Sequence, residues 1–317
     1  MYRQFLPHMN MENSRFLFRP GTLNLQEFED CKVAVVQRQV SVHNLAAMRH
    51  IKAAGIKIVY DLDDNLWSLP AANPAKKVFD QHKEGFAMCA VEADVITVST
   101  QGLQTAARTA FGFKKEIVVC PNGMDFNFFH QKPIQKDDGL TVIGWAGSNT
   151  HREDMIEALS ILPEVLDSNP QSRIEFVGAP PDNFSHEQMR FRVWVPVGEF
   201  ANRMASWAWD ISIAPLAENR FNRSKSCIKL LEAAALKIPC LVSDVQPYNE
   251  FCSLGGQDLK WLLCSTAQQW KTKLQILLHE PERRQFLGQR THEVARLFYD
   301  MKKLKHNWQR VFEQVVQ

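Results

Sequence analysis

The stretch that decides the fold runs from Asn222 to Ser243 and reads NRSKSCIKLLEAAALKIPCLVS. An apolar run from Ile211 to Leu216 precedes it, and a second apolar run, Ile238 to Val242, lies at its end. Such short runs are typical of buried strands in a parallel sheet. Between them, apolar residues recur at helical spacing, namely Cys227, Ile228, Leu230, Leu231 and Ala234. The stretch therefore predicts a strand, a helix and a second strand.

The predicted helix carries charge on one face, because Lys225, Lys229 and Glu232 are three or four residues apart. We expect Ser224, Lys225 and Ser226 at its N-terminus. In open α/β sheets, ligands bind at the carboxyl ends of strands, and a helix N-terminus there attracts phosphate. Two lysines can hold a diphosphate, and Glu232 can accept the hydroxyls of a ribose or hexose. The pattern indicates a nucleotide-sugar site, although the same spacing also suits an ordinary solvated helix face.

Two further segments follow predicted strands. In Gly144–Thr150, reading GWAGSNT, Gly147 lets the backbone approach a phosphate and Ser148 can add a hydroxyl, while Arg152 is either a phosphate ligand or a surface charge. In Asp61–Asn65, reading DLDDN, three carboxylates would repel one another unless a cation or a proton is shared. The free-energy cost of this repulsion indicates that the cluster has a functional role. The alternative is that Asp63 or Asp64 caps a helix that begins at Leu66.

Strand and helix patterns alternate along the chain, which predicts an α/β protein with parallel sheets. The segment Asn127–Gly139 lacks periodicity and marks a domain boundary, and residues 268–317 read as nearly continuous helix. The predicted strands are Val33–Val36, Ile56–Tyr60, Val95–Val98, Ile117–Val119, Thr141–Trp145, Ile174–Val177, Ile211–Pro215 and Cys240–Val242.

Composition agrees with two globular domains of roughly 150 residues each, since the chain has 317 residues, of which 45% are hydrophobic and 23% charged. A net charge of +2 gives no indication of a nucleic-acid partner. The seven cysteines are odd in number and scattered, so we expect reduced thiols in a cytoplasmic protein rather than disulfides or a zinc site. No signal peptide is evident, and no apolar run approaches the ~20 residues of a transmembrane helix.

Taken in order, these motifs resemble the family-4-type glycosyltransferases of the GT-B fold. The resemblance implies two Rossmann-like domains facing across a cleft: an acceptor-binding domain (1–135), a nucleotide-sugar-binding domain (136–295), and a C-terminal helix (296–317) that returns to the first domain. The residues that carry it are Val59–Trp67, Asn73-Pro74, Ala93–Thr100, Val118–Asp125, Gly144–His151, Ile213–Leu216, Phe221–Ser226, Lys229, Glu232, Pro239 and Ser243-Asp244.

The resemblance also implies an activity. We expect transfer of a hexosyl or pentosyl group from a nucleoside-diphosphate sugar to an acceptor hydroxyl, with retention and without a metal or other cofactor. The donor is expected to bind Gly147, Ser148, Arg152, Ser224, Lys225, Ser226, Lys229 and Glu232. The expected catalytic residues are Asp63, Asp64 and Lys229, and the expected acceptor-binding residues are Asp61, Asn65 and Arg38.

The chain departs from the family pattern in four places, one of which is Lys237, where glycine is common before Ile-Pro. The family's histidine near the acceptor aligns with Asp63, and the first of its two glutamates is replaced by Ser224 within the element Asn-Arg-Ser-Lys-Ser. The family also opens with a strand and a glycine loop, whereas this chain begins MYRQFLP. We therefore expect a shortened first domain, with its sheet edge rebuilt by Arg15–Phe18 or covered by another chain.

The acceptor is left open between a glycan or lipid-linked glycan and a hydroxymethylated DNA base. A DNA-binding face would use Arg15, Phe16, Phe18, Arg19, Arg38, His43, Arg49 and His50. Two other functions remain as alternatives. One is a haloacid-dehalogenase-like phosphatase that uses Asp61 as nucleophile, Asp63 as acid/base and magnesium. The other is a nucleotide-sugar-binding protein without catalysis.

Overall fold

The structure is a computed structural model that describes residues 2–15, 25–112, 114–129, 139–179, 184–196 and 198–317. The chain forms two compact units. Unit 1 consists of Met1–Gly123, Asn219–Ser226 and Met301–Gln317, and unit 2 consists of Met124–Glu218 and Cys227–Asp300. The chain therefore passes between units at residues 123/124 and 300/301, where the sequence-based division lay at 135/136 and 295/296. The short segment of residues 219–226 also belongs to unit 1.

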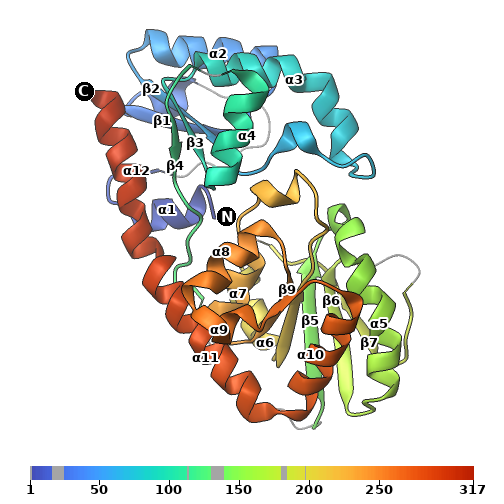
Figure 1. The fold of residues 1–317 in the computed structure, drawn as a ribbon. Helices are drawn as coiled ribbons and strands as arrows, with labels where there is room; N and C mark the ends of the chain where they lie inside the picture. Colours follow the sequence, from blue (N-terminus) through green and yellow to red (C-terminus); the bar gives the residue numbers. More distant parts are fainter. Residues whose placement is uncertain (1, 16–24, 113, 130–138, 180–183, 197) are drawn as a thin grey trace. The chain divides into compact units, whose positions relative to one another are not determined.

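Unit 1 contains a four-stranded parallel sheet in the order β1-β2-β3-β4, with β1 at Val33–Gln37, β2 at Lys57–Leu62, β3 at Val95–Val98 and β4 at Ile117–Val119. Helices α2 (Val42–Ala53), α3 (Ala75–Glu92) and α4 (Gln101–Phe111) connect consecutive strands. Because each connection steps to the next strand in one direction, right-handed crossovers place all three helices on one face of the sheet (Figure 1).

The two faces of this sheet have separate cores. Tyr60, Phe86 and Leu103 belong to the core beneath α2, α3 and α4. On the other face, Val59 and Val95 pack with Trp308 and Val311 of α12 (Met301–Val316), and α12 also contacts α1 (Phe5–Met9). The strand residues alternate between the two cores, as the period of two along a strand requires.

Unit 2 has a six-stranded parallel sheet in the order β10-β9-β8-β5-β6-β7. Numbered from its own first strand, this is the Rossmann order 3-2-1-4-5-6 read from the opposite end. The sequence of strands reverses between β5 and β8, which are hydrogen-bonded neighbours. The strands are β5 (Thr141–Gly147), β6 (Ser172–Gly178), β7 (Met189–Arg192), β8 (Ile211–Ala214), β9 (Cys240–Ser243) and β10 (Leu263–Cys264).

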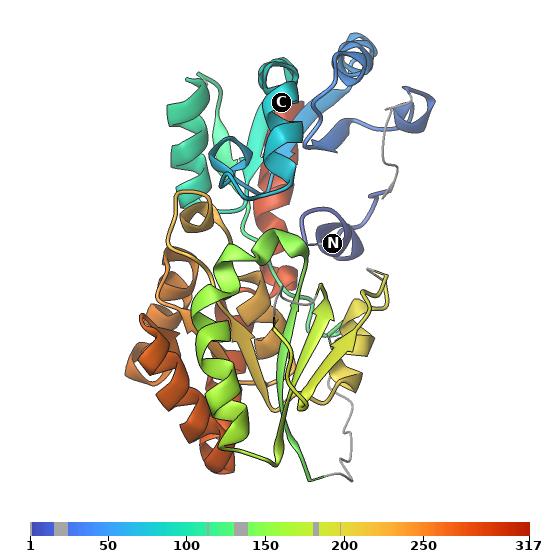
Figure 2. The same ribbon diagram turned by 90° about the vertical axis from the view of Figure 1, so that its right-hand side faces the viewer.

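Helices cover both faces of this sheet (Figure 2). From the centre of the sheet, β5, β6 and β7 follow one another toward one edge, and β8, β9 and β10 follow one another toward the other edge. Right-handed crossovers therefore place α5 and α7 on opposite faces. Helix α5 packs against α10, and α7 packs against α11. The helices are α5 (Ile156–Asp167), α6 (Phe200–Ser206), α7 (Ile228–Ala235), α8 (Gln246–Leu254), α9 (Gly256–Lys260), α10 (Ala267–His279) and α11 (Pro281–Phe298).

The sequence-based fold class is confirmed, and all eight predicted strands are present within one or two residues at each end. Strands β7 and β10 were not predicted. Strand β7 reads MRFR and is mostly exposed at the sheet edge, so it lacks an apolar signal, and β10 has only two residues. The C-terminal helical region is interrupted at Glu280 and at Tyr299-Asp300, which gives three helices. Residues 16–18 of the predicted edge segment, and 130–138 of the predicted boundary, lie outside the described residues.

Local signals account for several helix ends. Thr100 caps α4 by accepting a hydrogen bond from the Leu103 amide, and Gly112 ends the same helix at φ 59°, in the left-handed region that glycine tolerates. Ser41 and Thr266 cap α2 and α10 in the same way. Within the described part of the chain, no helix is long and apolar enough to cross a membrane.

Candidate functional site

The point of strand reversal in unit 2 brings Gly147, at the end of β5, beside the first turn of α7. Because connections leave β5 and β8 in opposite directions, the carboxyl ends of these strands form the usual ligand crevice of this topology. A Cβ at Gly147 would lie 2.5 Å from Cζ2 of Trp145 and 3.0 Å from Nζ of Lys229. At Gly178, with φ +101°, a Cβ would lie 2.4 Å from the Gly147 carbonyl oxygen. A side chain at 147 would therefore have to displace Trp145 or Lys229, and one at 178 would strike the Gly147 carbonyl.

Lys229 and Glu232 lie on α7, as predicted, one turn apart. The Lys229 ammonium donates to the Ala146 carbonyl and lies 5.0 Å from the centroid of the Trp145 ring. Glu232 is 8% exposed. The half-buried Lys229 ammonium is suited to an anionic group, and the buried Glu232 carboxylate can accept hydroxyl groups.

The predicted start of α7 is wrong. The helix begins at Ile228, and Asn222–Ser224 instead form a separate 3-10 turn that belongs to unit 1 with Lys225 and Ser226. Side chains of unit 1 hold this segment: the Asn65 amide donates to Ser224 Oγ at 3.1 Å, Thr100 Oγ1 donates to the Ser224 carbonyl at 2.8 Å, and the Asn122 amide donates to Ser226 Oγ at 2.7 Å. These contacts with residues about 100 to 160 positions away override the helical pattern.

Beside Gly147, the loop after β5 carries a histidine–aspartate pair that the sequence analysis did not single out. His151 Nδ1 is 2.7 Å from Asp154 Oδ2, and Asp154 Oδ1 accepts the Ala217 amide at 2.9 Å. The hydroxyls of Ser148 and Thr150 are 2.6 Å apart and exposed, and Arg152 is exposed. The spacing of three between His151 and Asp154 was the available signal, since such residues share a helix face.

In unit 1, Asp61 is fully buried at the centre of a hydrogen-bond network. Its carboxylate forms an ion pair with Arg3 and accepts Thr97 Oγ1 at 2.8 Å. The side-chain amides of Gln37 and Gln4 also donate to it, at 3.3 and 3.4 Å. A carboxylate with these donors and no solvent exposure cannot act as the nucleophile of the phosphatase alternative, which is therefore not supported.

Asp63 and Asp64 follow β2 and are more open. Asp63 pairs with Arg38 at 3.2 Å, and this pairing raises the pKa of Arg38. Arg38 has φ 49°, an uncommon backbone conformation for a residue other than glycine. Burial raises the pKa of Asp64, the charge of Asp63 raises it further, and Lys225 and Arg38 lower it. The carboxylates of Asp63 and Asp64 thus interact with the cations of Arg38 and Lys225 within unit 1.

The predicted site residues are divided between the units. Unit 2 contains Gly147, Ser148, Arg152, Lys229 and Glu232, and unit 1 contains Arg38, Asp61, Asp63, Asp64, Asn65, Ser224, Lys225 and Ser226. The unit 1 residues lie on the carboxyl side of β1 and β2 and on the segment 222–226.

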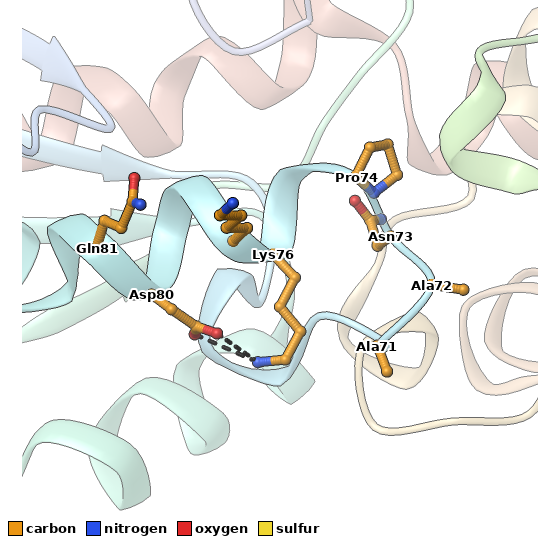
Figure 3. Close-up of a pocket in the computed structure, with 8 residues that line it drawn as sticks. Ala71, Ala72, Asn73, Pro74, Lys76, Asp80 and Gln81 are labelled. Carbon is orange, nitrogen blue, oxygen red and sulfur yellow. Dashed lines mark hydrogen bonds and ion pairs between the residues drawn. The ribbon is translucent and has the colours of Figure 1, made fainter.

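Two surface hollows among the described residues are lined by other side chains. One, of about 620 Å³, is at the start of α3 in unit 1 and is lined by Asn73, Pro74 and the ion pair Lys76–Asp80 (Figure 3). The other, of about 840 Å³, lies in unit 2 between α9 and the junction of α10 with α11, where Arg283 stacks 4.3 Å from the Trp261 ring centroid. Neither includes a predicted site residue, so the candidate site rests on the strand topology and on the contacts at Gly147.

All seven cysteines are free thiols. Burial raises the pKa of Cys227, Cys240 and Cys264 to about 12 and that of Cys89 to about 11. Buried thiols of this kind are chemically inert, so they give no candidate nucleophile.

No family model and no curated protein sequence matches this chain, whereas solved structures do. The HepE protein of Anabaena, solved in complex with UDP-glucose, matches with a TM-score of 0.66 at 14% identity, over 92% of this chain and 80% of that chain. Sucrose-phosphate synthase from Thermosynechococcus elongatus matches with a TM-score of 0.65 at 12% identity, over 90% and 73%.

The pneumococcal O-GlcNAc transferase GtfA, in complex with UDP and GlcNAc, matches with a TM-score of 0.62 at 12% identity, over 92% of this chain and 59% of that chain. Likeness at such identities establishes the fold. The chain therefore has the GT-B fold of these structures, with two Rossmann-like α/β domains.

Proposed function

We propose that the chain is a glycosyltransferase that moves a sugar from a nucleoside-diphosphate sugar to an acceptor hydroxyl. The observation that carries this proposal is the contact of Gly147, at the end of β5, with Lys229 of α7 beside the strand reversal of unit 2. The fold supports it, because the similar structures include complexes with UDP-glucose and with UDP and GlcNAc.

In this proposal the donor binds the crevice of unit 2. The backbone at Gly147 approaches the diphosphate, Ser148 and Arg152 add polar contacts, and the Lys229 ammonium offsets the negative charge that grows on the departing nucleoside diphosphate. A positioned cation gives this stabilisation without a metal. The Glu232 carboxylate accepts hydroxyls of the ribose or of the transferred sugar, and the buried position of that carboxylate fixes its direction.

The acidic cluster of unit 1 is proposed to serve the acceptor. Asp63 and Asp64 orient the attacking hydroxyl, and the raised pKa of Asp64 suits a group that exchanges a proton. Asp61 is buried and forms an ion pair with Arg3, so it positions the end of β2 instead of touching the acceptor. Lys225 moderates the charge of Asp64.

We propose a glycan hydroxyl as the acceptor, a hexosyl or pentosyl group as the transferred sugar, and retention as the stereochemical outcome. The DNA alternative is not carried forward, because Arg38 pairs with Asp63 and Arg49 pairs with Glu92 at 3.0 Å. These side chains are therefore engaged by carboxylates, and Phe16, Phe18 and Arg19 lie outside the described residues.

The test measures binding and turnover separately. Isothermal titration with UDP, ADP, GDP and dTDP in EDTA is expected to identify one nucleotide whose affinity falls at least tenfold in Lys229→Met, because charge-assisted hydrogen bonds contribute about 1.5–3 kcal/mol. Lys260→Met, an exposed lysine of α9, is the matched control. Release of that nucleotide from its sugar conjugates then reports catalysis. Tight binding without release would favour the binding-protein alternative, and no binding by the unaltered protein would refute the proposal.

A further inference from the structure

The pair His151–Asp154 in unit 2 has the construction of a positioned ligand. Asp154 is 8% exposed, and its two carboxylate oxygens have different partners, the His151 imidazole at 2.7 Å and the Ala217 amide at 2.9 Å. One partner lies in the loop after β5 and the other in the segment after β8. The carboxylate is therefore held between the two chain segments that form the crevice, and it fixes the imidazole in turn.

The same imidazole shares the Trp145 indole with the proposed phosphate-binding lysine. His151 meets the indole edge-to-face, with ring centroids 6.3 Å apart at 84°, and Lys229 Nζ is 5.0 Å from the indole centroid. Both groups thus lie against one ring, directly beside Gly147, where a Cβ would strike that ring.

The indole itself adds a second indication of a ligand. Trp145 is 3% exposed, and its Nε1 has no hydrogen-bond partner within the described parts of the chain. Buried donors are nearly always satisfied in folded proteins, by protein, water or ligand. The ring that carries this donor lies against the Lys229 ammonium and the His151 imidazole, so the three side chains together offer donors that suit an anionic oxygen.

We propose that His151, oriented by Asp154, is a further ligand of the donor diphosphate. This inference rests on the proposed function and extends it to a residue that is not among the expected donor-binding residues. Because Asp154 holds the Nδ1 side of the ring, Nε2 is directed away from the carboxylate. In the imidazolium form Nε2–H donates to a phosphoryl oxygen, and the Asp154 carboxylate stabilises the positive charge.

Titration calorimetry on the full chain tests this, with the tightest binder among UDP, ADP, GDP and dTDP as one probe and its nucleoside as the other. In His151→Phe, which keeps a ring against Trp145, the diphosphate is expected to bind about tenfold more weakly while the nucleoside changes less than twofold. His151→Gln keeps an amide N–H near the Nε2 position without charge, and about a threefold loss is expected.

The matched control is His186→Phe, since His186 forms another histidine–aspartate pair, with Asp167 at 3.1 Å, near the start of β7. This variant is expected to bind both probes as the unaltered protein does. Equal weakening in both histidine variants, unchanged diphosphate affinity in His151→Phe, or equal loss of diphosphate and nucleoside would each overturn the inference. If His151→Phe does not fold, His151→Gln decides by the same criteria.

Failure of this inference is distinguishable from failure of the proposed function. If the unaltered protein binds a diphosphate, and Lys229→Met weakens it but His151→Phe does not, the inference is wrong and the donor crevice stands. If the unaltered protein binds none of the four diphosphates, the proposed function is refuted and the inference with it.

Discussion

Replacing Arg3 by leucine tests the view that Asp61 organises unit 1 from within. Arg3 is 4% exposed and Asp61 is fully buried, although 58 residues separate them in the chain. Arg3 also donates to the Cys120 carbonyl and lies 4.8 Å from the centroid of the Trp308 ring. The arginine thus ties the N-terminal segment to β2, to the end of β4 and to α12.

The expected cost follows from leaving a carboxylate buried without its cation. Breaking a buried ion pair by removing one partner typically destabilises a protein by about 3–5 kcal/mol, and the lost cation–π contact with Trp308 adds about 0.5–1 kcal/mol. Thr97 and Gln37 still donate to Asp61 in the variant, which reduces the penalty. We therefore expect a loss of about 3 kcal/mol in the free energy of unfolding of unit 1.

Urea unfolding followed by hydrogen exchange and mass spectrometry gives this value for each unit separately. Peptides from β2 should lose protection in Arg3→Leu, whereas peptides from β8 in unit 2 should not change. Arg108→Leu, an exposed arginine of α4, is the control and should shift stability by less than about 0.5 kcal/mol. If Arg3→Leu and Arg108→Leu lower the free energy of unfolding of unit 1 equally, the buried network around Asp61 does not stabilise this unit and the prediction is refuted.

Three further predictions concern the crevice, the acidic cluster and the thiols. Gly147→Ala should weaken nucleotide binding at least tenfold, because its Cβ would lie 2.5 Å from Trp145, whereas Gly198→Ala, with open space around it, should not; calorimetry decides between them. Burial and the charge of Asp63 raise the pKa of Asp64, so the folded state keeps this proton to higher pH than the unfolded chain. The resulting stabilisation is full below the unfolded pKa and is lost as pH rises through the folded pKa. Asp64→Asn should remove that decline in urea unfolding measured upward from pH 4, and parallel profiles for the two proteins would contradict the assignment. Finally, a thiol reagent should label the half-buried Cys31 quickly in the native protein and the six buried cysteines only after denaturation, as mass spectrometry of labelled peptides would show; rapid native labelling of the others would be inconsistent with their burial.

The candidate site was predictable where it depends on local pattern. The acidic cluster follows an apolar run, so its place at the carboxyl end of β2 could be predicted from strand periodicity. Lys229 and Glu232 are one helical turn apart, and their common face follows from that spacing. Gly147 at the end of β5 was predictable for the same reason, since the apolar strand ends in small residues.

Other features depend on contacts between distant residues. Residues 222–226 continue the charged helical pattern, yet they form a separate turn because Asn65, Thr100 and Asn122 bind them in unit 1. The burial of Asp61 could not be foreseen, because its cation comes from Arg3 near the N-terminus. The pairing of Asp154 with the Ala217 amide likewise joins loops 63 residues apart.

The sequence by itself determined the α/β class and eight of the strands, because apolar periodicity reflects the backbone geometry of each element. The tertiary structure alone decided that β8 pairs with β5, which creates the strand reversal and places Gly147 beside Lys229. Strand order depends on hydrogen bonds and packing between segments far apart in the chain, and local side-chain patterns do not encode which segments meet.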